Sequence, residues 1–167
     1  MQLAGGALFC IHYILLGVLV GGLLNGLAVV RAIVYSSRER FRGDSKLWLI
    51  AFIGASVSIY VLNFTLLGRE ISPPSLLLEL LPVIGVVSTS IGMSMDSARA
   101  TRRSSFVNSP CWLIYNLINF SIGGIAGEII CLISITVGTL RFDLKSKRAP
   151  VTLGEGDAQD AQSQITT

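Results

Sequence analysis

The sequence predicts an all-α membrane protein with about six short transmembrane helices, grouped into two parallel units of which the first is incomplete. Hydrophobic residues make up 51% of the chain and charged residues only 14%. The lysines and arginines fall in short clusters between apolar segments. A long apolar stretch, Ser109–Arg141, carries one formal charge, Glu128, before its closing arginine. These three observations predict an integral membrane protein with one carboxyl group inside an apolar segment.

The composition excludes a soluble globular domain. A chain of 167 residues with so few charges would expose large apolar patches to water. We therefore expect the lipid bilayer as the main partner. The net charge of +3 comes from clusters that flank apolar segments, which is typical of membrane loops, so no nucleic-acid partner is expected. The first residues lack the basic segment of a cleavable signal peptide, and we expect a retained helix there.

Residues that carry chemistry are sparse in this sequence. Cys10, Cys111 and Cys131 lie inside apolar segments without a CxxC spacing, which is typical of helix packing. His12 is the single histidine and has no Asp or Glu near it in sequence, so no metal site and no cofactor are expected. The sequence contains no visible nucleophile–base set, carboxylate pair or phosphate-binding loop, and we do not expect an enzyme.

Glycines and basic clusters divide the apolar segments into helices. Gly17 and the pair Gly21-Gly22 divide an N-terminal apolar run that is too long for one span of about 20 residues. The clusters at 38–46 and 96–103 are expected to be basic loops. The predicted segments are a partial first unit at 1–37 (helices at about 2–16 and 18–37), a cytoplasmic basic loop at 38–46, a linker helix at 47–68, a second three-helix unit at 75–142 whose first helix is 75–95, and a disordered cytoplasmic tail at 143–167.

The stretch Ser109–Arg141 is also too long for a single span. If it crossed the membrane once, the basic residues after Leu140 would lie opposite the basic segment 96–103. A break near Asn119–Ser121 places all three basic clusters on one side, which the positive-inside rule favours. We therefore expect two helices in this stretch, and both chain termini in the cytoplasm.

An internal repeat supports the two units. When Tyr13 is placed on Tyr115, the pair Gly21-Gly22 falls on Gly123-Gly124. The helices that carry these glycine pairs then run in the same direction, and parallel repeats are a known transporter architecture. The first unit lacks its first helix, so we expect either a segment upstream of Met1 or a second copy of the chain, as a homodimer, to complete it.

Several motifs resemble the YgjV-type bacterial inner membrane proteins. They are ELLPVIGVVSTS at 79–90, CWLIYN at 111–116, and SIGGIAGE at 121–128 with the later pair Arg141-Phe142. The similarity runs from about residue 8 to 142. More remotely, a proline-containing helix followed by W-x-x-Y resembles SWEET, semiSWEET and PQ-loop sugar transporters.

The SWEET resemblance implies parallel three-helix bundles, a kink or hinge at Pro82, and a solute site at the depth of Asn25 and Glu128. The sequence departs from that pattern in three ways. One unit carries Glu in place of Asn, no Gln follows the proline, and the first helix of the first unit is absent. The resemblance therefore implies a fold more than a function.

Glu128 is the strongest candidate site residue, at about 12 Å along its predicted helix. Insertion scales put the cost of a charge at the centre of a membrane helix at about 2.5–3.5 kcal/mol, so we expect it to face the bundle interior. It binds a solute or a proton, or it accepts a structural hydrogen bond from Asn116, Asn119 or Tyr115. Asn25 lies at a matching depth and either bonds across the bundle or lines a cavity.

Other polar residues have simpler predicted roles. Glu79 is expected in the first turn of its helix, near the outer interface, where it complements the helix dipole. Arg31 is expected to reach the cytoplasmic interface with its long side chain. Glycines four residues apart, as in Gly123 and Gly127, are expected to let helices approach closely.

Two functions remain open on the sequence. The first is a SWEET-like facilitator of a small polar solute in the bacterial inner membrane, with a midplane cavity lined by Tyr13, Asn25, Tyr115, Asn116 and Glu128. The second is a membrane scaffold or accessory subunit that transports nothing and uses the same polar residues to lock helices together.

Overall fold

The computed structural model describes residues 2–43 and 45–144, and every regular element among them is a helix. In chain order the helices are α1 (Gln2–Leu15), α2 (Leu19–Ser36), α3 (Arg38–Phe41), α4 (Lys46–Thr65), α5 (Pro73–Ser94), α6 (Ala98–Ile118), α7 (Ile122–Gly138) and the π-helical η1 (Thr139–Leu144). The tail beyond Leu144, which the sequence predicts to be disordered, lies outside the described residues.

Four helices of the described chain are long and apolar enough to cross a membrane: Leu19–Ser36, Lys46–Thr65, Pro73–Ser94 and Ile122–Phe142. At 14 residues, α1 is shorter than a full span. Helix α6 has 21 residues, but its first half is rich in Arg, Ser and Thr. The prediction of an all-α membrane protein is confirmed. Of the six predicted helices, α1 is shorter than a full span and α6 is polar in its first half.

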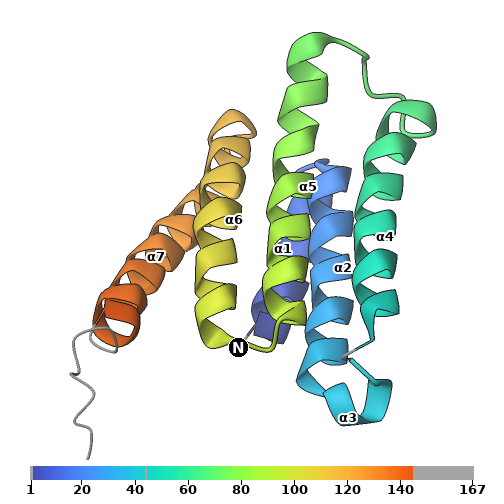
Figure 1. Ribbon diagram of the computed structural model, residues 1–167. Helices are drawn as coiled ribbons and strands as arrows, with labels where there is room; N and C mark the ends of the chain where they lie inside the picture. Colours follow the sequence, from blue (N-terminus) through green and yellow to red (C-terminus); the bar gives the residue numbers. More distant parts are fainter. Residues whose placement is uncertain (1, 44, 145–167) are drawn as a thin grey trace, which may run out of the picture.

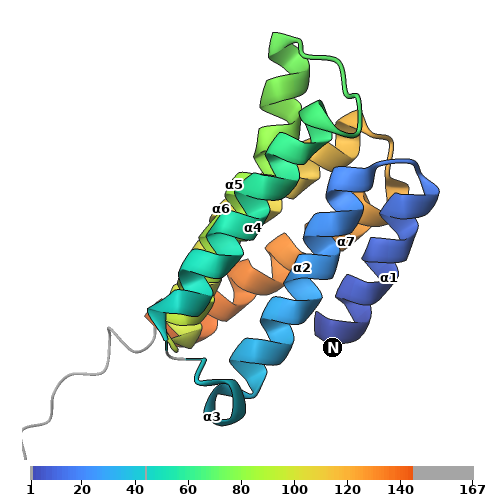
Figure 2. The same cartoon turned by 90° about the vertical axis from the view of Figure 1, so that its right-hand side faces the viewer.

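The long helices run alternately up and down in a bundle (Figure 1). Helix α5 packs between α4 and α6, and α2 packs against α1, α4 and α5. In Figure 2 the helices α4, α5 and α6 lie to one side and α1 and α2 to the other. Helix α7 follows α6 and packs against it. The bundle therefore has an interior between α5–α6 and the helices α1, α2 and α7.

The apolar stretch Ser109–Arg141 folds back on itself as predicted. Helix α6 ends at Ile118, α7 begins at Ile122, and Phe120 in the turn between them has a φ of 53°. The Arg102 guanidinium lies 6.0 Å from the centre of the Phe142 ring, so the start of α6 adjoins η1, which follows the end of α7. Figure 1 places these ends and α3 at the same end of the bundle.

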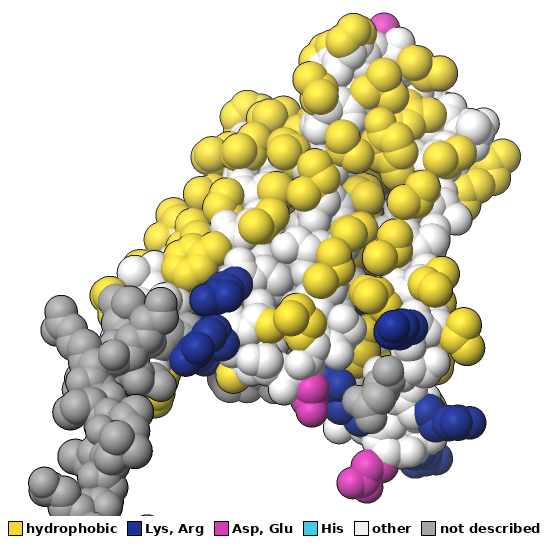
Figure 3. Space-filling model, in the orientation of Figure 1, with side chains coloured by type: hydrophobic (Ala, Val, Ile, Leu, Met, Phe, Trp, Pro, Cys, Tyr) yellow, Lys and Arg dark blue, Asp and Glu magenta, His cyan; other side chains and the backbone are white. Residues whose placement is uncertain are grey.

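The second basic segment is not a loop, and this part of the prediction is wrong. Ser97 caps α6, which begins at Ala98, so Arg99, Arg102 and Arg103 lie on its first turns. In the first basic segment, α3 forms one short helical turn. Arginine is a good helix former, and a serine cap stabilises the start of a helix whose first turns contain arginine. The basic side chains still gather at one end of the molecule (Figure 3).

Serine side chains begin four of the helices. Each accepts a hydrogen bond from a backbone N–H of the first turn at 3.3 to 3.4 Å, which satisfies one of the unpaired donors at a helix start. The four capping residues are Ser45, Ser72, Ser97 and Ser121. Pro73 follows the cap of α5, a position where a missing N–H costs nothing.

The hairpins α1–α2 and α6–α7 have the same turn. Val18 N–H donates to the Tyr13 carbonyl at 2.9 Å, and Ser121 N–H donates to the Asn116 carbonyl at 3.0 Å. Gly17, at a φ of 72°, corresponds to Phe120. The turns therefore match when Tyr13 is placed on Asn116, one residue away from the sequence alignment that placed Tyr13 on Tyr115.

An aromatic cluster fills the centre of the bundle. Tyr13 lies 5.7 Å from Trp112 and 6.4 Å from Tyr115 between ring centres. Gly21 of α2 lets these rings approach, because a Cβ there would lie 3.1 Å from Tyr13. The buried members of this cluster are Tyr13, Val20, Leu24, Val83, Val86, Trp112 and Tyr115.

The hairpin turn predicts a difference between two glycine substitutions. At Gly17 and at Gly54, an added methyl group meets no described atom within 4 Å, so only the backbone distinguishes them. Gly17→Ala forces an L side chain into the left-handed region and lowers the free energy of unfolding by about 1–2 kcal/mol. Gly54→Ala lies mid-helix in α4 and raises it by up to about 1 kcal/mol. Thermal unfolding in detergent, followed by circular dichroism, measures both; equal shifts would contradict the turn geometry.

Candidate functional site

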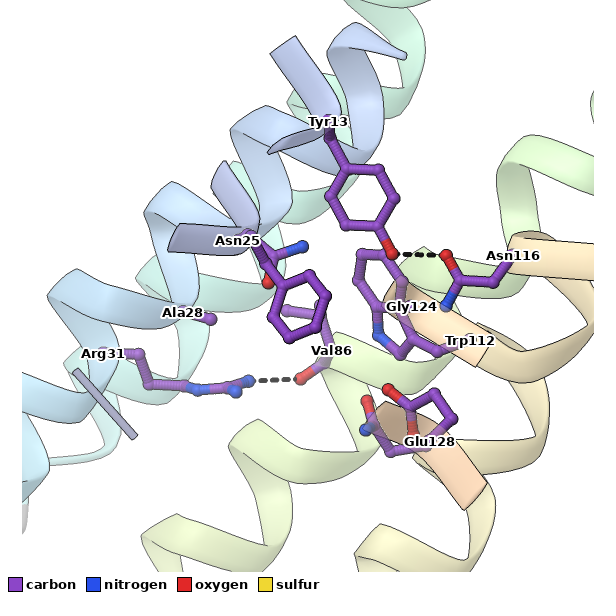
Figure 4. Close-up of a pocket in the computed structure, with 11 residues that line it drawn as sticks. Tyr13, Asn25, Ala28, Arg31, Val86, Trp112, Asn116, Gly124 and Glu128 are labelled. Atoms are coloured by element: carbon purple, nitrogen blue, oxygen red, sulfur yellow. Dashed lines mark hydrogen bonds between the residues drawn. The ribbon is translucent and has the colours of Figure 1, made fainter. Parts of the chain in front are cut away.

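A cavity of about 130 Å³ lies inside the bundle, with residues from five helices in its wall (Figure 4). It lies between α5–α6 and the helices α1, α2 and α7. The lining residues are Phe9, Tyr13, Asn25, Ala28, Arg31, Val86, Asn108, Trp112, Asn116, Gly124 and Glu128. Of the five predicted site residues, the structure brings Tyr13, Asn25, Asn116 and Glu128 together around this cavity.

Tyr13 and Asn116 form the contact that joins the two hairpins. The Tyr13 hydroxyl donates a hydrogen bond to Oδ1 of Asn116, and both side chains are almost fully buried. The Asn116 amide lies directly over Gly124 of α7, where a Cβ would overlap it. The glycine of the SIGGIAGE motif is therefore needed at this point so that the asparagine can turn toward α1 (Figure 4).

A second polar contact joins the hairpins near their turns. Nε2 of His12 lies 2.9 Å from the Ser121 hydroxyl, the same side chain that caps α7. The single histidine is thus a partner of a helix cap in α7. Among the described residues there is no group of three His, Cys, Asp or Glu side chains that would hold a metal ion.

Glu128 reaches the cavity from α7 and is half-buried. The side chain of Ser109 on α6 lies close to its carboxyl group. Its Oε2 atom is fully buried and has no geometrically formed hydrogen bond among the described residues, and the Ser109 hydroxyl is the donor that lies close to the carboxyl group. The three donors expected from the sequence do not bond it, because the Tyr115 hydroxyl and the Asn119 amide are engaged elsewhere and the Asn116 amide nitrogen has no partner.

Asn25 faces the cavity from α2. Its amide Nδ2 donates to the carbonyl of Gly21 in its own helix at 2.9 Å. That bond leaves the amide oxygen available toward the cavity (Figure 4). Of the two roles expected from the sequence, the position fits the cavity-lining one.

Arg31 is part of the site, and its predicted position at the cytoplasmic interface is wrong. Only 8% of its surface is exposed. One guanidinium nitrogen donates to the Val86 carbonyl at 2.7 Å and to the Ser90 hydroxyl at 2.8 Å, both on α5. Its Nε is buried without a partner in the described chain. Carbonyl and hydroxyl acceptors on a neighbouring helix make an inward position possible for a charge that lipid would not solvate.

Aromatic and amide side chains complete the wall, and sequence reasoning missed most of them. Phe9 comes from α1, and Asn108 and Trp112 come from α6. Gly85 of α5 allows them to approach, since a Cβ there would lie 2.8 Å from Oδ1 of Asn108 and 3.1 Å from Trp112. The signal in the sequence is the spacing of four residues from 108 to 112 to 116, which places these side chains on one face of α6.

Tyr115 does not line the cavity, unlike the prediction. It is fully buried, and its hydroxyl donates to Oε2 of Glu79 at 3.3 Å. Glu79 is also buried, at 4% exposure, and its Oε1 lies 3.6 Å from Nε of Arg69. Because α5 begins at Pro73, Glu79 lies beyond the first turn. The predicted role of Glu79 at the helix dipole is therefore wrong.

Pro82 lies inside α5 and is almost fully buried. The helix continues through it from Pro73 to Ser94. A proline removes one backbone hydrogen bond and weakens the helix at that point. Its role as a hinge stays a prediction.

The fold and the cavity define an α-helical membrane protein with a polar site in its interior. The Imp-YgjV family model, described as bacterial inner membrane protein, matches residues 1–146 of the chain. The chain therefore belongs to this family of bacterial inner membrane proteins, as the motifs in its sequence suggested. No curated protein matches the chain, and no solved structure does.

The packing of Asn116 on Gly124 predicts a difference between two adjacent glycines. Gly124→Ala places a methyl group on the Asn116 amide and lowers the free energy of unfolding by about 1–3 kcal/mol. At Gly123 the nearest described atom to a Cβ is 3.9 Å away, on His12, so Gly123→Ala leaves stability unchanged or slightly raised. Thermal unfolding of the two purified variants measures the difference. Equal stability of the two would contradict the contact between α6 and α7.

Proposed function

We propose that the protein is a SWEET-like facilitator of a small polar solute, and not an enzyme. The observation that carries this proposal is the cavity itself, because it holds Arg31, Glu128 and three amides inside a membrane protein. Polar groups at membrane depth are costly, and they commonly mark the path of a substrate or an ion. The hairpins α1–α2 and α6–α7 both contribute to the wall, as do the paired units of parallel-repeat transporters.

The contacts around the cavity suggest how such a facilitator works. On the side of the hairpin turns, the bond between Tyr13 and Asn116 joins the two hairpins. On the opposite side, Arg31 is bonded to α5. In the proposed cycle one hairpin rocks against the other, breaks one set of contacts at a time, and uses Pro82 as the hinge in α5.

The orientation in the membrane is part of the same proposal. Basic residues gather at the end that holds α3, the start of α6 and η1 (Figure 3). By the positive-inside rule this end faces the cytoplasm, and so do both termini. The two hairpin turns then face the other side of the membrane.

A second candidate function is a scaffold or accessory subunit that transports nothing. It is supported by the buried hydrogen bonds that tie helices together, between Tyr13 and Asn116 and between Tyr115 and Glu79. A homodimer stays a prediction. Within one copy, only 11% of the most apolar window of the span Ile122–Phe142 is buried, which leaves a face for lipid or a second copy to cover.

Transport assays on two cavity variants test the proposed function. In proteoliposomes, Glu128→Gln and Asn25→Ala are expected to lower solute flux at least about tenfold, because each removes a polar group that faces the solute. Glu70→Gln is the matched control, since Glu70 is exposed on the α4–α5 loop, and its flux is expected to equal that of the wild type.

The same variants distinguish the two candidate functions. If both cavity variants leave every measured flux and the growth phenotype unchanged, the site is wrong. If Glu128→Gln lowers stability in detergent or alters the proteins that copurify, with no dependence on any solute, the scaffold is the better account.

A further inference from the structure

The cavity carries opposite charges on different helices. Arg31 enters it from α2 and Glu128 from α7 (Figure 4). The described bonds of Arg31 go to the Val86 carbonyl and the Ser90 hydroxyl of α5, not to the carboxyl group. A buried positive charge attracts a negative group of a ligand, and a buried negative charge attracts a positive one. The attraction is strong because the dielectric constant inside the cavity is low.

Three atoms of these lining residues are buried and lack a hydrogen-bond partner within the described chain. They are Nε of Arg31, Nδ2 of Asn116 and Oε2 of Glu128. Arg31 is 8% exposed and Asn116 only 1%. Burying such a group without a partner costs about 1–3 kcal/mol, and more when it is charged, so native proteins keep few of them. Two of the three atoms are donors and one is an acceptor.

The donors and the acceptor specify complementary chemistry. A ligand carboxylate would accept hydrogen bonds from the guanidinium and amide nitrogens, and charge-assisted hydrogen bonds are stronger than those between neutral groups. An ammonium group donates to Glu128. The aromatic rings of Phe9, Tyr13 and Trp112 belong to the same wall, and an aromatic ring attracts a cation placed over its face.

The size of the cavity limits the ligand. Its volume is about 130 Å³. An engineered protein cavity of about 150 Å³ admits benzene, so this one has room for on the order of six non-hydrogen atoms. A hexose is too large for the cavity in this conformation, whereas glycine or alanine fits.

We propose that the solute is a small zwitterion, with a carboxylate and an ammonium group on a skeleton of a few carbons. Its carboxylate binds Arg31, and its ammonium group binds Glu128. A simple anion or cation would leave one buried charge without a counter-charge, and a neutral polyol would leave both. This inference rests on the proposed function, because it names the substrate class of the same site.

The test uses the full-length protein with four kinds of probe. Thermal shift in detergent and counterflow in proteoliposomes are measured with glycine and L-alanine as zwitterions, propionate as the acid, ethylamine as the amine and glycerol as the polyol. We expect saturable binding and exchange of the zwitterions, and at least about tenfold weaker binding of each single-charge probe.

Glu128→Gln sharpens the test, because it removes the negative charge and keeps the shape of the side chain. In this variant the ratio of propionate to L-alanine affinity is expected to rise at least about tenfold, since the remaining cavity charge is that of Arg31. A merely structural role of Glu128 would lower stability without changing this ratio. Arg40→Gln, on the exposed α3, is the control and keeps the wild-type preference. Size-exclusion chromatography and circular dichroism check that each variant is folded.

Each outcome supports or overturns the facilitator, the zwitterionic solute, or both. Exchange of zwitterions with the preference change in Glu128→Gln supports both. Exchange of glycerol or of a single-charge probe instead overturns the zwitterion and leaves the facilitator. Zwitterions that stabilise the protein but do not exchange support the ligand class and overturn transport. If no probe binds or exchanges, both proposals fail.

Discussion

The structure depends on one constraint, which is that a charge inside a membrane helix must turn away from the acyl chains. Arg31 on α2 and Glu128 on α7 both obey it by facing the same interior cavity. That requirement fixes the rotation of the two helices about their own axes. It also requires α7 to be a separate helix, because only the turn after Ile118 brings Glu128 back beside α1 and α2.

Small residues make this arrangement possible. Gly124 accepts the Asn116 side chain, Gly21 accepts the tyrosine rings, and Gly85 accepts Asn108 and Trp112. Each glycine therefore positions a polar or aromatic side chain at the cavity, and the helix contacts and the candidate site are built from the same residues. The hairpins α1–α2 and α6–α7 share one turn geometry, although the sequence repeat places Tyr13 on Tyr115 and the turns match when Tyr13 is placed on Asn116.

Hydropathy and basic clusters predicted the helices and the break near Phe120, because the cost of burying charge in lipid acts on the sequence directly. The repeat and the SWEET resemblance pointed to five site residues, and the structure brings four of them around one cavity. What failed depended on contacts between distant residues. Arg31 turns inward because α5 offers acceptors, and Tyr115 leaves the cavity because Glu79 accepts its hydroxyl. Residues 98–103 of the second basic segment are helical because Ser97 caps α6 and arginine favours the helix. None of these partners is visible from composition or periodicity.

The fold-back of α6 and α7 is the central claim, and cysteine labelling in intact cells tests it most directly. Single cysteines would replace Arg99, Phe120 and Arg141 in a protein without its native cysteines, and a membrane-impermeant thiol reagent would be added from outside. The account predicts that Phe120→Cys is labelled and that Arg99→Cys and Arg141→Cys are labelled only after the membrane is opened. Labelling of Arg99→Cys and Arg141→Cys from opposite sides would contradict it, because Ser109–Arg141 would then cross the membrane once.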